Sequence, residues 1–315
     1  MKSITLTQDI QMPALGLGTW KAQGQEVVQA ILEAIKMGYR HIDTAMIYDN
    51  EVEVGQAIAM AINMGFCSRE DLFITSKLWN DRHEPHEVLP ALEASLDRLK
   101  IDYLDLYLIH WPIAFNSGVV LPESSADYLP LDKVPLVDTW QAMLKAKQTG
   151  LTRAVGVSNF TVGHLRLLEE CDSMPVVNQV EMHPLLSQEK LRTYCQDKGI
   201  TLTAYAPLGS TDRAEGMKSS DEPNLFGVAG IEAMAKKYSC SPAQILISYH
   251  ICRGDSVIPK AVQTSHLADN LMATEIDLEP NDIQTLSKLN KDYRFINGHF
   301  FDCPEQGYNW VFGND

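Results

Sequence analysis

The feature that most constrains the fold is a series of eight short apolar runs spread along the whole 315-residue chain. They cover residues 14–19, 41–45, 72–78, 103–110, 153–159, 176–181, 201–208 and 255–260. Segments with the apolar period of a helix lie between successive runs. Strands that are apolar on both faces and alternate with helices indicate a parallel sheet, and eight such units favour an α/β fold closed into a (β/α)8, or TIM, barrel. An open doubly wound sheet would carry G-x-G-x-x-G after its first strand, and this motif is absent.

Helix boundaries can also be predicted from the sequence. One apolar stripe predicts a helix that ends at Gly38; its members are Val27, Ile31, Ala34 and Ile35. A second helix of the same design should end at Gly65, and Ser241 with Pro242 should begin a third.

The chain contains no recognisable linker, so we expect one domain over residues 1–315. Two short β-like runs around a polar turn within 3–15 predict a hairpin at the barrel floor. Three long irregular stretches, 112–137, 208–227 and the C-terminal tail 291–315, are expected at the carboxyl ends of the strands. Long loops at that face commonly build and cover a site.

Composition and charge exclude several classes of protein. A formal net charge of -15 disfavours nucleic acid or an anionic membrane surface as a partner, and no window is apolar enough for a membrane span. Six irregularly spaced cysteines without a CxxC motif are typical of free thiols in a reducing compartment, so we expect a cytoplasmic protein. The nine histidines are scattered singly, and we expect no metal site.

Four ionisable residues interrupt the apolar pattern where three neighbouring strands end: Asp43, Tyr48, Lys77 and His110. Each alone is typical of a turn, of packing or of a solvated strand end. Together they would meet in one pocket at the carboxyl face of the barrel. A lysine beside an aspartate stays charged, and this cation would favour the deprotonated form of a phenol whose usual pKa is about 10. Such a phenol could protonate a developing alkoxide, so a hydride must arrive from elsewhere.

Several motifs, in this order, resemble those of the aldo-keto reductases over nearly the whole length. They are "MPALGLGTWK" (12–21), "GYRHIDTAMIYDNEVEVG" (38–55), "LFITSKLWN" (72–80), "DYLDLYLIHWP" (102–112), "AVGVSNF" (154–160), "NQVEMHP" (178–184), "YAPLGS" (205–210) and "VIPKA" (257–261). Within that superfamily the chain is similar to the aldose reductase, xylose reductase and aldose-6-phosphate reductase branch.

The resemblance implies a catalytic tetrad. Tyr48 would be the general acid, Lys77 would lower its pKa, and Asp43 would hold Lys77. His110 would position the carbonyl, and a histidine there favours carbonyl reduction over double-bond reduction. The implied activity is NAD(P)H-dependent reduction of an aldose, an aldose phosphate or a small aliphatic or aromatic aldehyde.

The resemblance also implies how the coenzyme is bound. Ser158, Asn159 and Gln179 would hold the nicotinamide amide, and Tyr205 would stack on the ring. Lys21 and Asp212 would pair across the cofactor as a clasp. The remaining implied cofactor contacts are Thr19, Leu208, Ser210, Lys260, Ala261, His266, Asp269 and Asn270.

Two of these positions depart from the family pattern. Ala261 replaces the usual serine and His266 the usual arginine, and both usual groups bind the 2'-phosphate. Losing a hydroxyl and a permanent cation should weaken that contact. We therefore expect NADP(H) with relaxed specificity, so that NAD(H) can also serve.

The resemblance implies an aromatic substrate pocket, with Trp20, Ile47, Trp79 and Trp111 around its mouth and Asn309 and Trp310 contributed by the tail. The expected partner is a small aldehyde or sugar, and the protein would be a monomer or a homodimer. Two alternatives remain: a cofactor-binding accessory or structural protein on the same fold, and a barrel lyase or aldolase in which Lys77 forms a Schiff base.

Overall fold

The computed structural model describes residues 2–219 and 221–313. Residues 314–315 of the predicted tail lie outside the described residues. Eight parallel strands form one sheet in the order β10-β9-β8-β7-β6-β5-β4-β3. Their bounds are β3 Leu17–Gly18, β4 His41–Asp43, β5 Phe73–Leu78, β6 Leu104–Ile109, β7 Thr152–Ser158, β8 Val177–Glu181, β9 Thr201–Tyr205 and β10 Ser256–Val257. Each lies within one of the eight predicted runs or within one residue of it.

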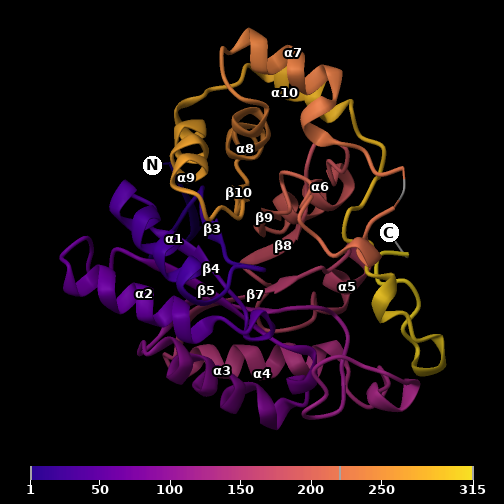
Figure 1. Ribbon diagram of the computed structural model, residues 1–315. Helices are drawn as coiled ribbons and strands as arrows, with labels where there is room; N and C mark the ends of the chain where they lie inside the picture. The colour runs from indigo at the N-terminus through magenta and orange to yellow at the C-terminus, as the bar shows by residue number, and fades with distance from the viewer. Residues whose placement is uncertain (1, 220, 314–315) are drawn as a thin grey trace.

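The sheet closes where its two edges meet. Parallel bridges join Leu15 to Val257 and Gly18 to Lys260. The amide of Val257 donates to the carbonyl of Ala14 at 2.8 Å, and the amide of Gly16 donates to the carbonyl of Val257 at 2.9 Å. The predicted α/β barrel is therefore confirmed, and Figure 1 shows its strands surrounded by helices.

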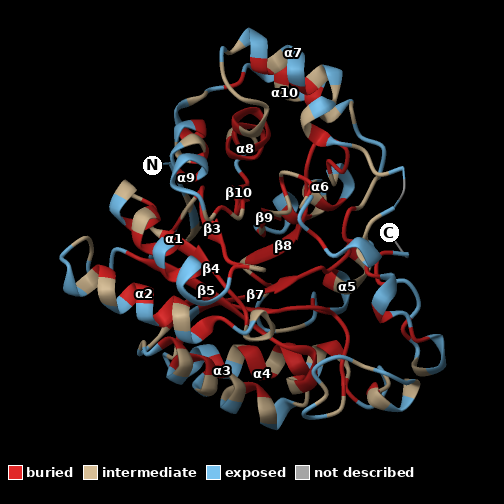
Figure 2. Cartoon of the chain, viewed as in Figure 1, coloured by how far each residue is buried: buried red, intermediate tan, exposed pale blue. Residues whose placement is uncertain are grey.

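The helices follow the strands along the chain. Their bounds are α1 Gly24–Met37, α2 Glu51–Asn63, α3 Pro85–Leu99, α4 Leu136–Gln148, α5 Val162–Leu167, α6 Glu189–Asp197, α7 Ala229–Lys237, α8 Pro242–Cys252, α9 Thr264–Met272 and α10 Pro280–Ser287. Figure 2 shows that most helices bury the faces turned towards the strands and expose the opposite faces, whereas α8 is buried on nearly all sides. None of the helices in the described part of the chain is both long and apolar enough to cross a membrane.

Two helix ends show how the sequence specifies these elements. Gly38 ends α1 with φ 111, and its amide donates to the carbonyls of Ala34 and Ile35; a side chain is disfavoured in that conformation. Ser241 begins α8 through a capping box with Gln244, and Pro242 occupies the first turn. Both predictions are confirmed. Gly65, with φ 74, lies just beyond the end of α2.

The predicted hairpin is present. Strands β1 (Ser3–Thr7) and β2 (Ile10–Pro13) pair antiparallel. Ile10 and Met12 pack in one cluster with Phe73 and Val177, the first residues of β5 and β8. The hairpin therefore covers the amino ends of the strands, which leaves the carboxyl ends for a site.

Candidate active site

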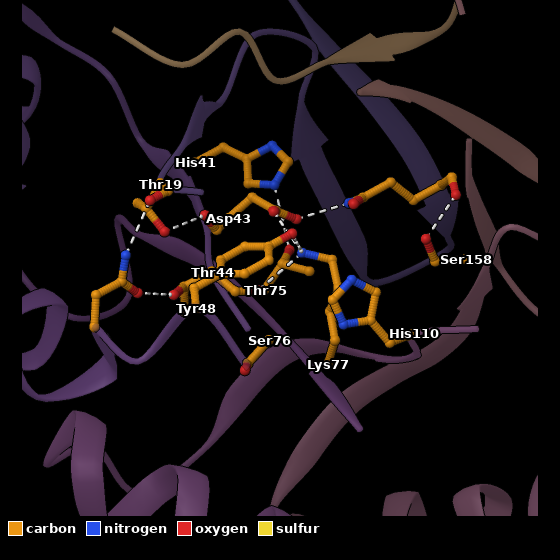
Figure 3. A network of polar contacts seen from close by, with 12 residues as sticks. Thr19, His41, Asp43, Thr44, Tyr48, Thr75, Ser76, Lys77, His110 and Ser158 are labelled. Atoms are coloured by element: carbon orange, nitrogen blue, oxygen red, sulfur yellow. Dashed lines mark hydrogen bonds and ion pairs between the residues drawn. The ribbon is translucent and has the colours of Figure 1, made fainter. Parts of the chain in front are cut away.

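The four predicted ionisable residues meet at the carboxyl face of the barrel (Figure 3). Lys77 Nζ lies 2.6 Å from Asp43 Oδ1 and 3.3 Å from the hydroxyl of Tyr48. It also donates to the carbonyl of Thr44 at 2.9 Å. The ring of His110 meets that of Tyr48 edge-on, with centroids 5.7 Å apart. A half-buried phenol thus meets a buried ammonium, carboxylate and imidazole at one corner.

Local structure explains how Tyr48 reaches this corner. The chain leaves β4 at Asp43 and forms a single 3-10 turn, Met46–Tyr48, which ends at Asp49 in the left-handed conformation. Gln23 Nε2 donates to the carbonyl of Tyr48 at 2.7 Å. Because the backbone is fixed at both ends of the turn, the phenol points back over the end of the strands.

Asn50 organises the same loop and was missed by the sequence analysis. Its amide nitrogen donates to the carbonyls of Thr19 and Ala22, each at 2.9 Å, and its oxygen accepts from Thr44 Oγ1 at 2.8 Å. In the sequence, Asn50 stands directly before a predicted helix, a position that normally indicates a helix cap. Here it makes no cap hydrogen bond and instead connects two strand ends.

A hydrogen-bond chain joins the tetrad to the predicted nicotinamide contacts. Gln179 Nε2 donates to Asp43 Oδ2 at 2.7 Å, and Ser158 Oγ donates to the carbonyl of Gln179 at 2.8 Å. Asn159 Nδ2 lies 3.2 Å from Ser158 Oγ, and its Oδ1 accepts from the Tyr205 hydroxyl at 2.7 Å. The residues predicted to bind the coenzyme and those predicted to catalyse therefore form one network.

The electrostatics of this corner differ from the prediction in one respect. Burial, and then the Asp43 carboxylate, raise the pKa of Tyr48 well above its usual value, whereas Lys77 was expected to lower it. Lys77 is paired with Asp43, so little net positive charge remains to offset the burial of the phenol. Burial also lowers the pKa of Lys77, although the nearby Asp43 carboxylate offsets part of this effect. Burial, Lys77 and His83 lower the pKa of His110 well below its usual value.

A cavity of about 790 Å³ extends from the tetrad to Lys260 and His266. Its lining includes most of the predicted residues: Thr19, Trp20, Lys21, Ile47, Trp79, Trp111, Ser158, Asn159, Gln179, Tyr205, Leu208, Ser210, Asp212 and Ala261. The volume lies in the range of cofactor and ligand sites. This lining fits a nicotinamide dinucleotide. Amide and hydroxyl groups near the tetrad could bind the nicotinamide amide, the Tyr205 ring offers a stacking surface, and Lys21 and Lys260 at the other end could bind phosphates.

Lys21 and Asp212, which were predicted to pair across the cofactor, form an ion pair. Lys21 Nζ also donates to Ser210 Oγ at 3.2 Å, and Asp212 Oδ2 lies 3.1 Å from Lys260 Nζ. Burial disfavours the charge on Asp212, but Lys21 and Lys260 hold the pKa of this carboxyl below its usual value. One carboxylate therefore joins the two cations at the far end of the cavity.

Backbone strain concentrates along the cavity wall. Four non-glycine residues of the lining adopt positive φ: Lys21 (67), Asn159 (63), Ala206 (47) and Ser210 (48). For a residue with a Cβ, the left-handed conformation is less stable than the right-handed one by about 1–2 kcal/mol. A fold that keeps four such residues around one cavity is typical of a functional site.

Five predicted residues do not line the cavity. Lys77 is one of them and reaches the site through its contacts with Asp43 and Tyr48. The other four lie elsewhere. Asp269 Oδ2 accepts from Ser241 Oγ at 2.8 Å, so it serves the beginning of α8, and its neighbour Asn270 is buried within α9. Trp310 stacks on His299 with ring centroids 5.2 Å apart and donates to the carbonyl of Asn297, and Asn309 is exposed. The tail contributes instead Ile296, Phe300 and Phe301, and other loops contribute Leu121 and Met217.

Comparison of the sequence with known proteins identifies the same family as the motifs do. The model of the aldo/keto reductase family matches residues 14–291. An aldo/keto reductase of Synechocystis sp. is 45% identical over 309 residues, which cover 98% of this chain and 94% of that protein. Aldo-keto reductase family 1 member A1 of Sus scrofa is 43% identical over 289 residues, 91% of this chain and 88% of that protein. The Danio rerio member A1-A is 42% identical over 301 residues, 93% of this chain and 91% of that protein.

Proposed function

The chain belongs to the aldo/keto reductase family, whose members are oxidoreductases that act on carbonyl groups with nicotinamide cofactors, and we propose that it reduces an aldehyde to the alcohol, with Tyr48 as the proton donor. The observation that carries the proposal is the position of Lys77. Its ammonium lies 3.3 Å from the Tyr48 hydroxyl while it is paired with Asp43 inside the protein.

The coenzyme supplies the hydride. Ser158, Asn159 and Gln179 would hold the nicotinamide end, next to the ring of Tyr205, and Lys21 and Lys260 would hold the phosphates. Tyr205 is itself fixed by its hydrogen bond to Asn159, so the platform for the ring is in place before anything binds.

The residues of the tetrad then have distinct tasks. A raised pKa keeps the proton on Tyr48 until an alkoxide develops nearby, and the adjacent ammonium of Lys77 stabilises the phenolate left after transfer. Asp43 keeps Lys77 charged against burial. His110, neutral because of burial, orients the carbonyl oxygen towards Tyr48.

The lining near Tyr48 supports a neutral apolar aldehyde over an aldose or an aldose phosphate. The side chains around the mouth are mostly aromatic or aliphatic: Trp20, Ile47, Trp79, Trp111, Leu121, Ile296, Phe300 and Phe301. The indole nitrogen of Trp79 already donates to the carbonyl of Val120 at 2.8 Å. The cations of the lining, Lys21 and Lys260, lie at the far end of the cavity, where they would hold the phosphates of the coenzyme rather than a phosphate of the substrate. Comparing kcat/KM for an aromatic aldehyde with that for an aldose phosphate tests this preference; a higher value for the phosphate would reverse it.

The rate of reduction is expected to vary little with pH between about pH 7 and pH 9. Tyr48 stays protonated below its pKa, which is raised above 10.0, and His110 stays neutral above its pKa, which is lowered below 6.5. Both residues therefore keep their working forms across this interval. The measurement is kcat/KM for the aldehyde against pH at saturating coenzyme. An ionisation inside the interval that disappears in His110→Gln would contradict the assignment.

His266→Arg is expected to raise the preference for NADPH over NADH about tenfold or more, because a charged hydrogen bond contributes about 1.5–3 kcal/mol. His266 and Lys260 line the same end of the cavity, where the 2'-phosphate would lie. The measurement is the ratio of KM values for the two coenzymes. Lys260→Met should move the ratio in the opposite direction. An unchanged ratio in both variants would place the 2'-phosphate elsewhere.

The proposed location is the cytoplasm. All six cysteines lie within the described residues, and each is a free thiol. Free thiols support a reducing compartment.

A further inference from the structure

A buried carboxylate outside the tetrad holds the C-terminal tail. Glu181 ends β8, and its side chain is fully buried. Its Oε1 accepts from the amide of Phe295 at 2.7 Å, and its Oε2 accepts from the amide of Ile296 at 2.8 Å. His183 Nε2 lies 2.9 Å from Oε1. One side chain thus binds two consecutive amides more than a hundred residues further along the chain.

The interaction is stronger than an ordinary backbone contact. Burial opposes the charge on Glu181, but the hydrogen bonds from His183 and from the two amides hold the pKa of this carboxyl below its usual value. Hydrogen bonds to an ionised acceptor are about twice as strong as neutral ones. Because each oxygen binds one amide, the pair of contacts fixes the orientation of the segment as well as its position.

The segment held in this way forms part of the cavity wall. Ile296 lines the cavity and packs in the aromatic cluster around Trp111. Phe295 contacts the ring of His183 at 4.9 Å between centroids, and the guanidinium of Arg213 lies 5.3 Å from the Phe295 ring. Arg213 in turn donates to the carbonyl of Ser210, at the cofactor end.

The tail has other attachments that do not involve Glu181. The amides of Lys291 and Tyr293 donate to the carbonyl of Leu185 at 3.0 and 3.1 Å, and Asn290 Oδ1 accepts from the amide of Ser187 at 3.0 Å. These contacts secure the chain before residue 294. Loss of the Glu181 carboxylate should therefore loosen the wall without detaching the whole tail.

We propose that Glu181 is a positioning residue that sets the shape of the carbonyl pocket by holding residues 295 and 296 of the tail. It acts through Ile296 and does not touch the substrate. The proposal rests on the proposed function for the identity of the pocket, whereas the attachment of the tail can be measured independently.

The test is Glu181→Gln, which keeps the size of the side chain and removes its charge. In the unliganded variant, hydrogen exchange of the amides of Phe295 and Ile296 should be about tenfold faster, or more. The KM for a bulky aromatic aldehyde should rise about five- to tenfold, with a smaller change in kcat. Ile296→Ala, which keeps Glu181, should raise the same KM.

Asp105→Asn is the matched control. Asp105 is also a buried carboxylate that accepts from a backbone amide, that of Ile74 at 2.9 Å, and it pairs with Arg69 and Arg153. It lies outside the cavity lining. The control should lower the melting temperature and leave both the KM and the exchange at 295–296 as in the wild type.

Two results would overturn the proposal: unchanged exchange at 295–296 in Glu181→Gln, or equal changes in KM in this variant and in the Asp105 control. If the wild type reduces no aldehyde, the proposed function fails, but the exchange measurement still decides whether Glu181 holds the tail. If Glu181→Gln does not fold, an unchanged KM in Ile296→Ala would overturn the role of the wall.

Discussion

Replacing Tyr48 by phenylalanine is expected to lower kcat/KM for aldehyde reduction by about 100- to 10,000-fold, the usual contribution of a positioned acid. The variant loses only the hydroxyl that lies 3.3 Å from Lys77 Nζ. The ring and its contacts remain, so the coenzyme should still bind. Initial rates measure the first effect, and quenching of tryptophan fluorescence measures coenzyme binding, since Trp20, Trp79 and Trp111 line the cavity.

Tyr205→Phe is the control for this variant. It also removes a phenolic hydroxyl from the cavity lining, but that hydroxyl donates to Asn159 Oδ1 rather than facing Lys77. Its effect on kcat/KM should be much smaller than that of Tyr48→Phe. Equal losses in the two variants, or a Tyr48→Phe enzyme that keeps most of its rate, would show that Tyr48 is not the acid.

Lys77→Met is expected to abolish most activity and to lower the free energy of unfolding by about 3–5 kcal/mol. The side chains of Lys77 and Asp43 are 0% and 2% exposed, so the substitution leaves a buried carboxylate without its cation. Gln179 still donates to Asp43 Oδ2, but a neutral amide cannot replace the lost charge. Denaturation in urea gives the stability, and initial rates give the activity.

The double variant Asp43→Asn with Lys77→Met separates the two effects. It removes the unpaired carboxylate, so much of the lost stability should return. The activity should not return, because no ammonium remains beside Tyr48. A double variant that recovers activity together with stability would mean that Lys77 serves only the fold.

The barrel itself could be predicted because its determinants are local. Each strand is a short apolar run, and helix ends are specified by residues such as Gly38 and the Ser241–Pro242 pair, whose effects act over one turn. The proximity of the four tetrad residues could be predicted for a similar reason, since polar residues at the carboxyl ends of adjacent parallel strands converge on one face of the barrel.

The parts of the site that were not predicted depend on long-range contacts. Nothing near Ile296 in the sequence shows that Glu181 will hold its amide, so the tail residues of the cavity wall could not be identified, and Trp310 was proposed instead. The direction of the Tyr48 pKa depends on burial and on how fully Asp43 neutralises Lys77. Neither quantity can be judged from residue types alone.

The most direct test of the proposed reductase activity is the initial rate of reduction of a neutral aromatic aldehyde by the wild-type protein, with NADPH and with NADH. With NADPH, we expect coenzyme to be oxidised and alcohol to be formed in equal amounts. NADH should also support turnover, because His266 and Ala261 line the phosphate end. If neither coenzyme were oxidised although both bound, the catalytic assignment of Tyr48 and Lys77 would be contradicted, and a cofactor-binding role on the same fold would replace it.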